Sequence, residues 1–271
     1  MLYYPIIYKI EDQNLFYNEH ELNFYSLESP SNISATQQSL ESCLKVIGEN
    51  DILITLPTTK DQLIDQNNIC KGYTEFFRSR YKTPELCMTF SGPNETILLI
   101  TDHIPLSEVP QAIDSKSIIH KIKLTLNQLD KYHAPIKEVI ISGLNPHSGE
   151  NGLLGTEDIH VNKAIESLER EFSNTAFSGP IPGDTLHFYQ KPESSQLLVY
   201  LYHDQGLAKF KALFQTIGVN QTLGLPFLRL SVDHGTAFDK YGKNLADARG
   251  CYYLLKYALK KWQIINEFKR N

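Results

Sequence analysis

The chain has 271 residues, of which 41% are hydrophobic and 21% charged, and its formal net charge is −5. This composition excludes a disordered chain, and an acidic balance without a long basic cluster excludes an electrostatic footprint for nucleic acid or an anionic membrane surface. Because no apolar run has the length of a membrane span and Met1–Ile10 lacks the features of a secretory signal, we expect a cytoplasmic protein with a small-molecule partner.

Five short apolar runs have the length of buried strands. They are Asp51–Thr55, Glu95–Thr101, Glu138–Ser142, Gln196–Tyr202 and Pro226–Val232. Segments with helical spacing separate most of these runs. Alternation of strands and helices predicts an α/β fold with a largely parallel sheet and helices on its faces. No repeat or linker marks a domain boundary, so residues 1–271 are taken as a single unit.

Two apolar stripes predict long helices. The first consists of Ile118, Ile122, Leu126 and Leu129. The second predicts a C-terminal helix whose lysines, Lys256, Lys260 and Lys261, face solvent; its apolar members are Leu245, Tyr252, Leu255, Leu259 and Trp262. The four cysteines are scattered without a CxxC pair, which predicts reduced thiols; they are Cys43, Cys70, Cys87 and Cys251.

Three histidines follow three of the predicted strands. His103 comes after Glu95–Thr101, His147 lies five residues past Ser142, and His203 follows Tyr202 directly. In open α/β sheets, ligands bind outside the carboxyl ends of the strands, so these imidazoles are expected to converge. Three neutral imidazoles suit a divalent transition metal such as zinc, with positions left open for substrate. The metal we expect is therefore zinc, and magnesium and cobalt are kept as alternatives.

Five ordered blocks carry a family resemblance. They are GLNPHSGENGLLGTED (Gly143–Asp158), GPIPGDT (Gly179–Thr185), YHDQGLAKFK (Tyr202–Lys211), GVNQTLGLPFLRLSVDHGTAFD (Gly218–Asp239) and GKNLAD (Gly242–Asp247), with weaker matches at Thr55–Lys60 and Gly72–Phe77. This series resembles the 4-hydroxythreonine-4-phosphate dehydrogenase family. The resemblance implies a fold like isocitrate and isopropylmalate dehydrogenases, with two intertwined α/β lobes, and a homodimer whose active site lies at the interface.

The resemblance also implies roles for particular residues. The metal ligands would be His103, His147 and His203. The substrate contacts would be Tyr73, Thr74, Lys211, Asn220 and Arg229, types that suit a phosphate dianion. Asp184 and Asp204 would lie near the metal and either orient a histidine or take part in proton transfer, although Asp184 serves equally well as a loop or capping residue.

The cofactor implied by the resemblance is NAD, with NADP as the alternative. His234, Gly235, Thr236 and Ala237 would lie against the dinucleotide, since glycine lets the backbone approach a ligand closely. There is no GxGxxG motif, which agrees with a family that binds NAD by another route. Without the surrounding blocks, a plain strand-to-turn segment would be the simpler reading of these residues.

The implied reaction is metal-dependent, NAD-linked oxidation of 4-phosphooxy-L-threonine to 2-amino-3-oxo-4-phosphooxybutanoate, followed by decarboxylation to 3-amino-2-oxopropyl phosphate, in pyridoxal phosphate biosynthesis. Two departures leave alternatives open. Met1–Phe24 contains no glycine where the family has a glycine-rich loop, and Tyr73 replaces a family histidine. The alternatives are a dehydrogenase of 4-phosphothreonate or 4-phosphoerythronate, and a non-catalytic metal- and phosphate-binding paralogue.

Overall fold

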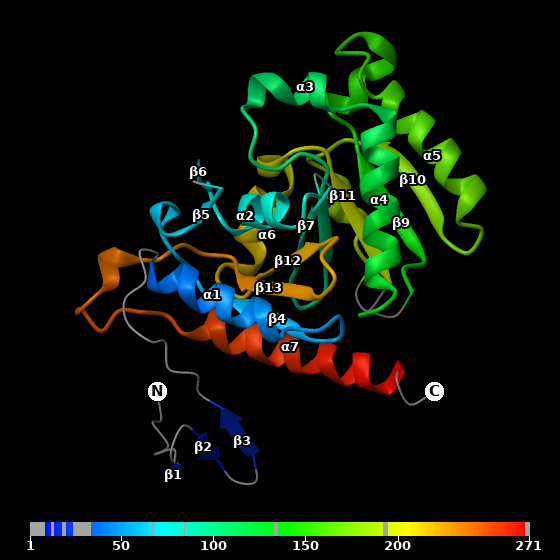
Figure 1. The fold of residues 1–271 in the computed structure, drawn as a ribbon. Coiled ribbons are helices and arrows are strands. Elements are labelled where there is room, and N and C mark those ends of the chain that lie inside the picture. Colours follow the sequence, from blue (N-terminus) through cyan, green and yellow to red (C-terminus); the bar gives the residue numbers. More distant parts are fainter. Residues whose placement is uncertain are drawn as a thin grey trace.

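The computed structural model describes residues 9–11, 14–17, 20–23, 34–66, 68–83, 85–132, 135–191 and 195–268. An eight-stranded sheet forms the centre of these residues, and helices cover both of its faces (Figure 1). The α/β class expected from the sequence is therefore confirmed. No helix among the described residues is long and apolar enough to cross a membrane.

The sheet is mixed in strand direction. Its order is β10 (Ala176–Ile181), β9 (Glu138–Ser142), β11 (Gln196–Tyr200), β8 (Thr96–Leu99), β7 (Cys87–Ser91), β12 (Val219–Leu223), β13 (Leu228–Val232) and β4 (Ile52–Thr55). The pairs from β10 to β8 are parallel, those from β8 to β13 are antiparallel, and β13 and β4 are parallel. The expected parallel sheet thus holds for the half that carries the three histidines, while the other half is largely antiparallel.

All five strands predicted from apolar runs are present, with ends shifted by up to two residues. Three strands of the sheet were not predicted, β7, β10 and β12. The sequence of β12 is VNQTL, and Gln221 and Thr222 within it are fully buried polar residues. A run with so many polar side chains gives little hydrophobic signal, because its burial depends on hydrogen-bond partners supplied by neighbouring strands.

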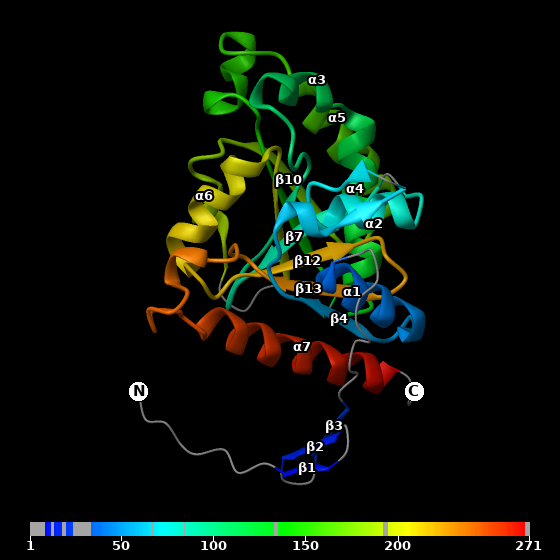
Figure 2. The same cartoon turned by 60° about the vertical axis from the view of Figure 1, so that its left-hand side comes forward.

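Seven helices are described: α1 (Ala35–Val46), α2 (Tyr73–Arg80), α3 (Val109–Ala112), α4 (Ser115–Leu129), α5 (Ile159–Glu171), α6 (His203–Phe214) and α7 (Arg249–Phe268). Figure 2 shows α6 on one side of the sheet and α4 and α5 on the other. One core cluster joins the sheet to α4, α5 and α7, a second joins it to α6, and a third lies under α1 and α2. The layers are therefore helix, sheet and helix.

Short elements complete the described residues. They are β1 (Lys9–Glu11), β2 (Asn14–Tyr17) and β3 (His20–Asn23) in a separate antiparallel sheet, the pair β5 (Ile64–Asp65) and β6 (Asn68–Ile69), and the 3-10 turns η1 (Lys60–Gln62), η2 (Leu106–Glu108), η3 (Pro146–Gly152), η4 (Leu186–Tyr189) and η5 (Phe238–Lys240). Residues Met1–Tyr8 lie outside the described residues.

The stripe predicted for α4 is confirmed. All four of its members are at most 2% exposed: Ile118, Ile122, Leu126 and Leu129. The helix begins where Asp114 accepts a hydrogen bond from the backbone N–H of Ser117 at 2.7 Å, while the Ser117 hydroxyl accepts one from the Asp114 N–H at 3.3 Å. This reciprocal capping box satisfies two N–H groups that would otherwise lack partners.

The apolar face predicted for the C-terminal helix is wrong. Its five members are 53–66% exposed: Leu245, Tyr252, Leu255, Leu259 and Trp262. Leu245 also precedes the helix, which begins at Arg249. The buried face consists instead of Leu254, Ala258, Lys261 and Ile265, so one of the lysines assigned to solvent is 3% exposed. The sequence of α7 carries two stripes of helical spacing, and the stripe with smaller side chains packs on β12 and β13.

Candidate active site

Two of the three predicted metal ligands lie together at the carboxyl ends of neighbouring parallel strands. His103 follows β8, and His203 follows β11 as the first residue of α6. Their ring centroids are 5.5 Å apart. Asp204 places Oδ1 2.6 Å from Nδ1 of His203, so Nε2 of this ring remains available to a metal. The position of Asp204 agrees with the role in orienting a histidine that the resemblance implied.

His147 does not join this pair within one chain. It lies after β9 in η3, where residues 147–151 have positive φ, and its side chain is exposed. The loop is held in part by Asp158, whose Oδ1 accepts the backbone N–H of Leu144 at 2.6 Å. Among the described residues, no group of three or more His, Cys, Asp or Glu side chains is placed to hold a metal ion. The structure therefore assembles two of the three ligands.

Four of the predicted substrate contacts share one pocket with His103. The pocket has a volume of about 350 Å³ and is lined by Tyr73, Thr74, Asn220 and Arg229. Tyr73 and Thr74 are the first two residues of α2, whose N-cap is Gly72 without a side-chain cap. Free backbone N–H groups at a helix N-terminus favour an anion, so this end of α2 would stabilise a negative charge in the pocket.

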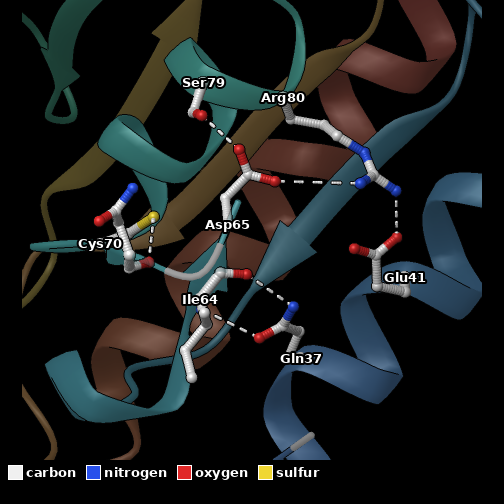
Figure 3. A network of polar contacts seen from close by, with 8 residues as sticks. Gln37, Glu41, Ile64, Asp65, Cys70, Ser79 and Arg80 are labelled. Carbon is white, nitrogen blue, oxygen red and sulfur yellow. Dashed lines mark hydrogen bonds and ion pairs between the residues drawn. The ribbon is translucent and has the colours of Figure 1, made fainter.

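Helix α2 is held in place by polar contacts to α1 and to the β5–β6 pair. Gln37 of α1 hydrogen-bonds both the carbonyl and the N–H of Ile64, at 2.7 and 2.9 Å (Figure 3). Asp65 accepts a hydrogen bond from the Ser79 hydroxyl, and Arg80 pairs with Glu41. These contacts hold the C-terminal end of α2, and Tyr73 and Thr74 lie at the opposite end of the same helix.

Arg229 is the most deeply buried cation of the pocket, at 4% exposure. It donates from Nε and Nη2 to the Thr55 hydroxyl at 3.0 and 2.6 Å, and from Nη1 to the Thr222 hydroxyl at 3.1 Å. The ring of Tyr73 lies 5.1 Å from the guanidinium carbon. Burial lowers the pKa of Arg229 to about 10. No carboxylate among the described residues forms an ion pair with it, so its described partners are two neutral hydroxyls and the ring of Tyr73.

A second arginine, Arg78, lines this pocket and was not predicted from the sequence. Arg78 of α2 places Nη2 2.5 Å from Oδ2 of Asp102, and the other oxygen of Asp102 accepts the N–H of His103 at 2.7 Å. Burial raises the pKa of Asp102, but the hydrogen bond and charge of Arg78 outweigh it and the pKa is lowered overall. The pair thus fixes the backbone of a metal-ligand candidate. The sequence signal for this pair is that Asp102 directly precedes His103.

Of three further predicted residues, Lys211, Asp184 and Asn220, only Asn220 lines the pocket. Lys211 of α6 does not line it and instead places Nζ 3.2 Å from Oδ1 of the buried Asp233. Burial raises the pKa of Asp233, although Lys211 and two nearby histidines oppose the shift. Asp184 is exposed in the turn between β10 and η4 and has no contact that links it to the histidine pair. Asn220 has a buried Oδ1 without a hydrogen-bond partner, as a ligand-facing amide would.

All four predicted cofactor residues line one larger cleft of about 1160 Å³: His234, Gly235, Thr236 and Ala237. The cleft lies between the loop at 56–59 and the loop at 234–248, beside the start of α7. Ala237 is in the left-handed conformation at φ 51°, and Nε2 of His234 is buried without a partner. A volume of this size and an unsatisfied imidazole nitrogen fit a large polar ligand such as a dinucleotide.

Comparisons with known proteins agree with this arrangement. The family model described as pyridoxal phosphate biosynthetic protein PdxA matches residues 19–258. A 4-hydroxythreonine-4-phosphate dehydrogenase of Desulforapulum autotrophicum is 37% identical over 79% of this chain, and the match spans 63% of that relative. A putative D-threonate 4-phosphate dehydrogenase of Oceanobacillus iheyensis is 34% identical over 87% of this chain and 71% of its own length. A solved 4-hydroxythreonine-4-phosphate dehydrogenase from Klebsiella pneumoniae superposes with a TM-score of 0.69 at 28% identity, covering 84% of this chain and 69% of that one.

Proposed function

Because the chain belongs to the PdxA family of pyridoxal phosphate biosynthetic proteins, we propose that it oxidises 4-phosphooxy-L-threonine with NAD+. The observation that carries this proposal is the buried guanidinium of Arg229, which has no carboxylate partner among the described residues and lines a pocket with His103. A phosphate dianion is the counterion that such a cation lacks, and Arg binds it with fork-like geometry. Thr74 and Asn220 line the same pocket and supply a hydroxyl and an amide.

The chemistry of the donor set fits a divalent metal. His103 and His203 have their ring centroids 5.5 Å apart and would each supply a ring nitrogen, and Asp204 holds the second ring in a fixed orientation. A bound metal would lower the pKa of the substrate hydroxyl and favour its deprotonation as hydride leaves for NAD+. Arg229 would hold the phosphate end, so that the hydroxyl on the carbon next to the phosphorylated carbon would face the histidines. The oxidised product is a β-keto acid, which loses carbon dioxide readily and would give 3-amino-2-oxopropyl phosphate.

The third predicted metal ligand, His147, bears on whether the protein forms a dimer. We propose a two-fold homodimer in which His147 of one copy completes the site of the other, since His147 is exposed and apart from the histidine pair of its own chain. Exposed apolar side chains lie beside it, with Leu153 81% and Ile159 52% accessible. Such side chains favour an interface. Sedimentation with and without a chelator tests this: a dimer loosened by metal removal supports it, and a monomer that turns over substrate contradicts it.

A second substrate is favoured by one specific observation. Tyr73 stands beside Arg229 in place of the family histidine, and it adds bulk without positive charge. A relative at 34% identity is named a putative D-threonate 4-phosphate dehydrogenase. The alternative is therefore a dehydrogenase of 4-phosphothreonate or a similar phosphorylated four-carbon acid.

One experiment separates these functions. Purified protein is loaded with zinc and supplied with NAD+ and a panel of 4-phosphooxy-L-threonine, 4-phosphothreonate and 4-phosphoerythronate, and NADH formation is followed. The highest kcat/KM on the phosphorylated amino acid supports the main proposal, and the highest value on an acid without the amino group supports the alternative. NADH from none of the three would contradict both.

A further inference from the structure

A third pocket, of about 640 Å³, opens at the opposite end of the sheet from the histidine pair. It is lined by the end of β7, the residues that begin β8 and β11, and one side of α7. Strand β8 runs from this pocket towards His103, so the two sites are separated by the length of a strand. The volume lies within the range of small-molecule sites. None of the residues predicted for substrate, metal or cofactor lines it.

Helix α7 gives this pocket a positive wall. Lys256, Lys260 and Lys261 all line it, and Lys261 is 3% exposed. The carboxylate among the described lining residues is that of Glu95, which is buried and paired with Lys209 of α6. Neither Lys256 nor Lys260 forms an ion pair with a described carboxylate. Among the described lining residues, positive charges therefore outnumber negative ones, and the concave setting reduces screening by solvent.

An aromatic wall stands beside the lysines. Tyr257 donates a hydrogen bond from its hydroxyl to Oε1 of Gln221 at 3.2 Å, and Gln221 donates to the Ser91 hydroxyl at 2.8 Å. These two buried hydrogen bonds fix the ring of Tyr257. Nζ of Lys261 lies over this ring, 4.8 Å from its centroid. Tyr253 lies alongside, with its ring centroid 6.5 Å from that of Tyr257. The pocket thus combines cationic groups with flat apolar surface.

We propose that this pocket binds a phosphorylated small molecule with an aromatic body, its phosphate held by Lys256, Lys260 and Lys261 and its ring lying against Tyr253 and Tyr257. The exposed ammonium groups of Lys256 and Lys260 match a dianion better than a singly charged carboxylate, and lysine binds phosphate as a point charge. Burial lowers the pKa of Lys261 to about 7, and an anion bound nearby would raise this pKa. The site is independent of the dehydrogenase reaction proposed above.

Calorimetric titration of the whole chain tests the proposal with pyridoxine 5'-phosphate as probe, because it carries a phosphate ester on an aromatic ring. Pyridoxine and inorganic phosphate are titrated separately. The proposal expects the intact probe to bind at least about tenfold more tightly than either fragment, since each part makes contacts of its own. Equal binding of the probe and inorganic phosphate would overturn the aromatic part, and absence of probe binding would overturn the site.

Two sets of variants locate the binding. The double variant Lys256→Ala, Lys260→Ala is expected to weaken binding of the probe by about tenfold or more, because it removes two charge-assisted contacts. A matched control, Lys45→Ala with Lys163→Ala, removes two exposed charges on α1 and α5 and is expected to bind as the wild type does. Arg229→Ala reports on the other pocket. Binding lost in Arg229→Ala and kept in the α7 double variant would assign the probe to the candidate active site and overturn the proposal.

Discussion

Replacing Arg229 with methionine should separate ligand binding from folding stability. The guanidinium is 4% exposed, and its described partners are the neutral hydroxyls of Thr55 and Thr222 and the ring of Tyr73. Burial lowers its pKa from 12.5 to about 10, which corresponds to on the order of 3 kcal/mol of lost solvation at about 1.36 kcal/mol per pKa unit. Methionine fills a similar volume and carries no charge, so this unfavourable contribution disappears in the variant.

The two threonine hydroxyls lose their donors in Arg229→Met, at about 1 kcal/mol each. The free energy of unfolding without ligand is therefore expected to stay within about 2 kcal/mol of the wild-type value or to exceed it. Affinity for the phosphorylated substrate is expected to fall by about tenfold or more, since a charge-assisted contact is worth about 1.5–3 kcal/mol.

Arg78→Met is the matched control, because Arg78 lines the same pocket but is paired with Asp102. Its removal leaves a carboxylate with a 9% exposed side chain without its cation, and we expect a loss of about 2–3 kcal/mol. Urea denaturation of the three proteins, with and without substrate, measures both effects. If Arg229→Met lost as much stability as Arg78→Met, or if substrate stabilised it as strongly as it stabilises the wild type, the account of Arg229 would be refuted.

Three further predictions concern other parts of the fold. Burial lowers the pKa of Lys261 from 10.5 to about 7, so between these pH values the folded state holds fewer protons than the unfolded state, and the free energy of unfolding should rise with pH. Lys261→Met should remove roughly 2 kcal/mol of this rise between about pH 7 and 9. Equal pH dependence of the wild type and the variant in urea denaturation would contradict it. Asp204→Asn should weaken zinc binding by about 10–100-fold in chelator competition, because Asp204 orients His203, and an unchanged affinity would show that it does not. Gly149→Ala should cost about 2 kcal/mol or more in denaturation, since φ is +77° and the added Cβ would lie 2.5 Å from a carbonyl oxygen; full stability would exclude this loop geometry.

The sequence predicted the part of the site that depends on strand ends. Short apolar runs place His103 and His203 after parallel strands, and parallel strands bring their carboxyl ends to one edge of a sheet. Arg229 was also identifiable, because an arginine inside an apolar strand must find an acceptor. The family resemblance predicts that residues 234–237 contact the cofactor, and the structure places these four residues in one cleft.

Other features depend on tertiary contacts that no local pattern records. The buried face of α7 was predicted wrongly because both of its apolar stripes have helical spacing. Packing on β12 and β13 buries the stripe that contains Leu254 and Ala258. Lys261 was assigned to solvent for the same reason. The Arg78–Asp102 pair joins residues 24 positions apart in sequence, and its existence follows from how α2 crosses the end of β8.

The central claim, that this chain is a metal-dependent dehydrogenase of a phosphorylated hydroxy-amino acid, is tested most directly by a product balance. Zinc-loaded protein is incubated with NAD+ and limiting 4-phosphooxy-L-threonine, and NADH, carbon dioxide and remaining substrate are measured together. The account predicts equal amounts of NADH and carbon dioxide, each matching the substrate consumed, and all three changes at a rate lowered by about tenfold or more in Arg229→Met. Substrate consumed without NADH, or no consumption by the zinc-loaded protein, would contradict it.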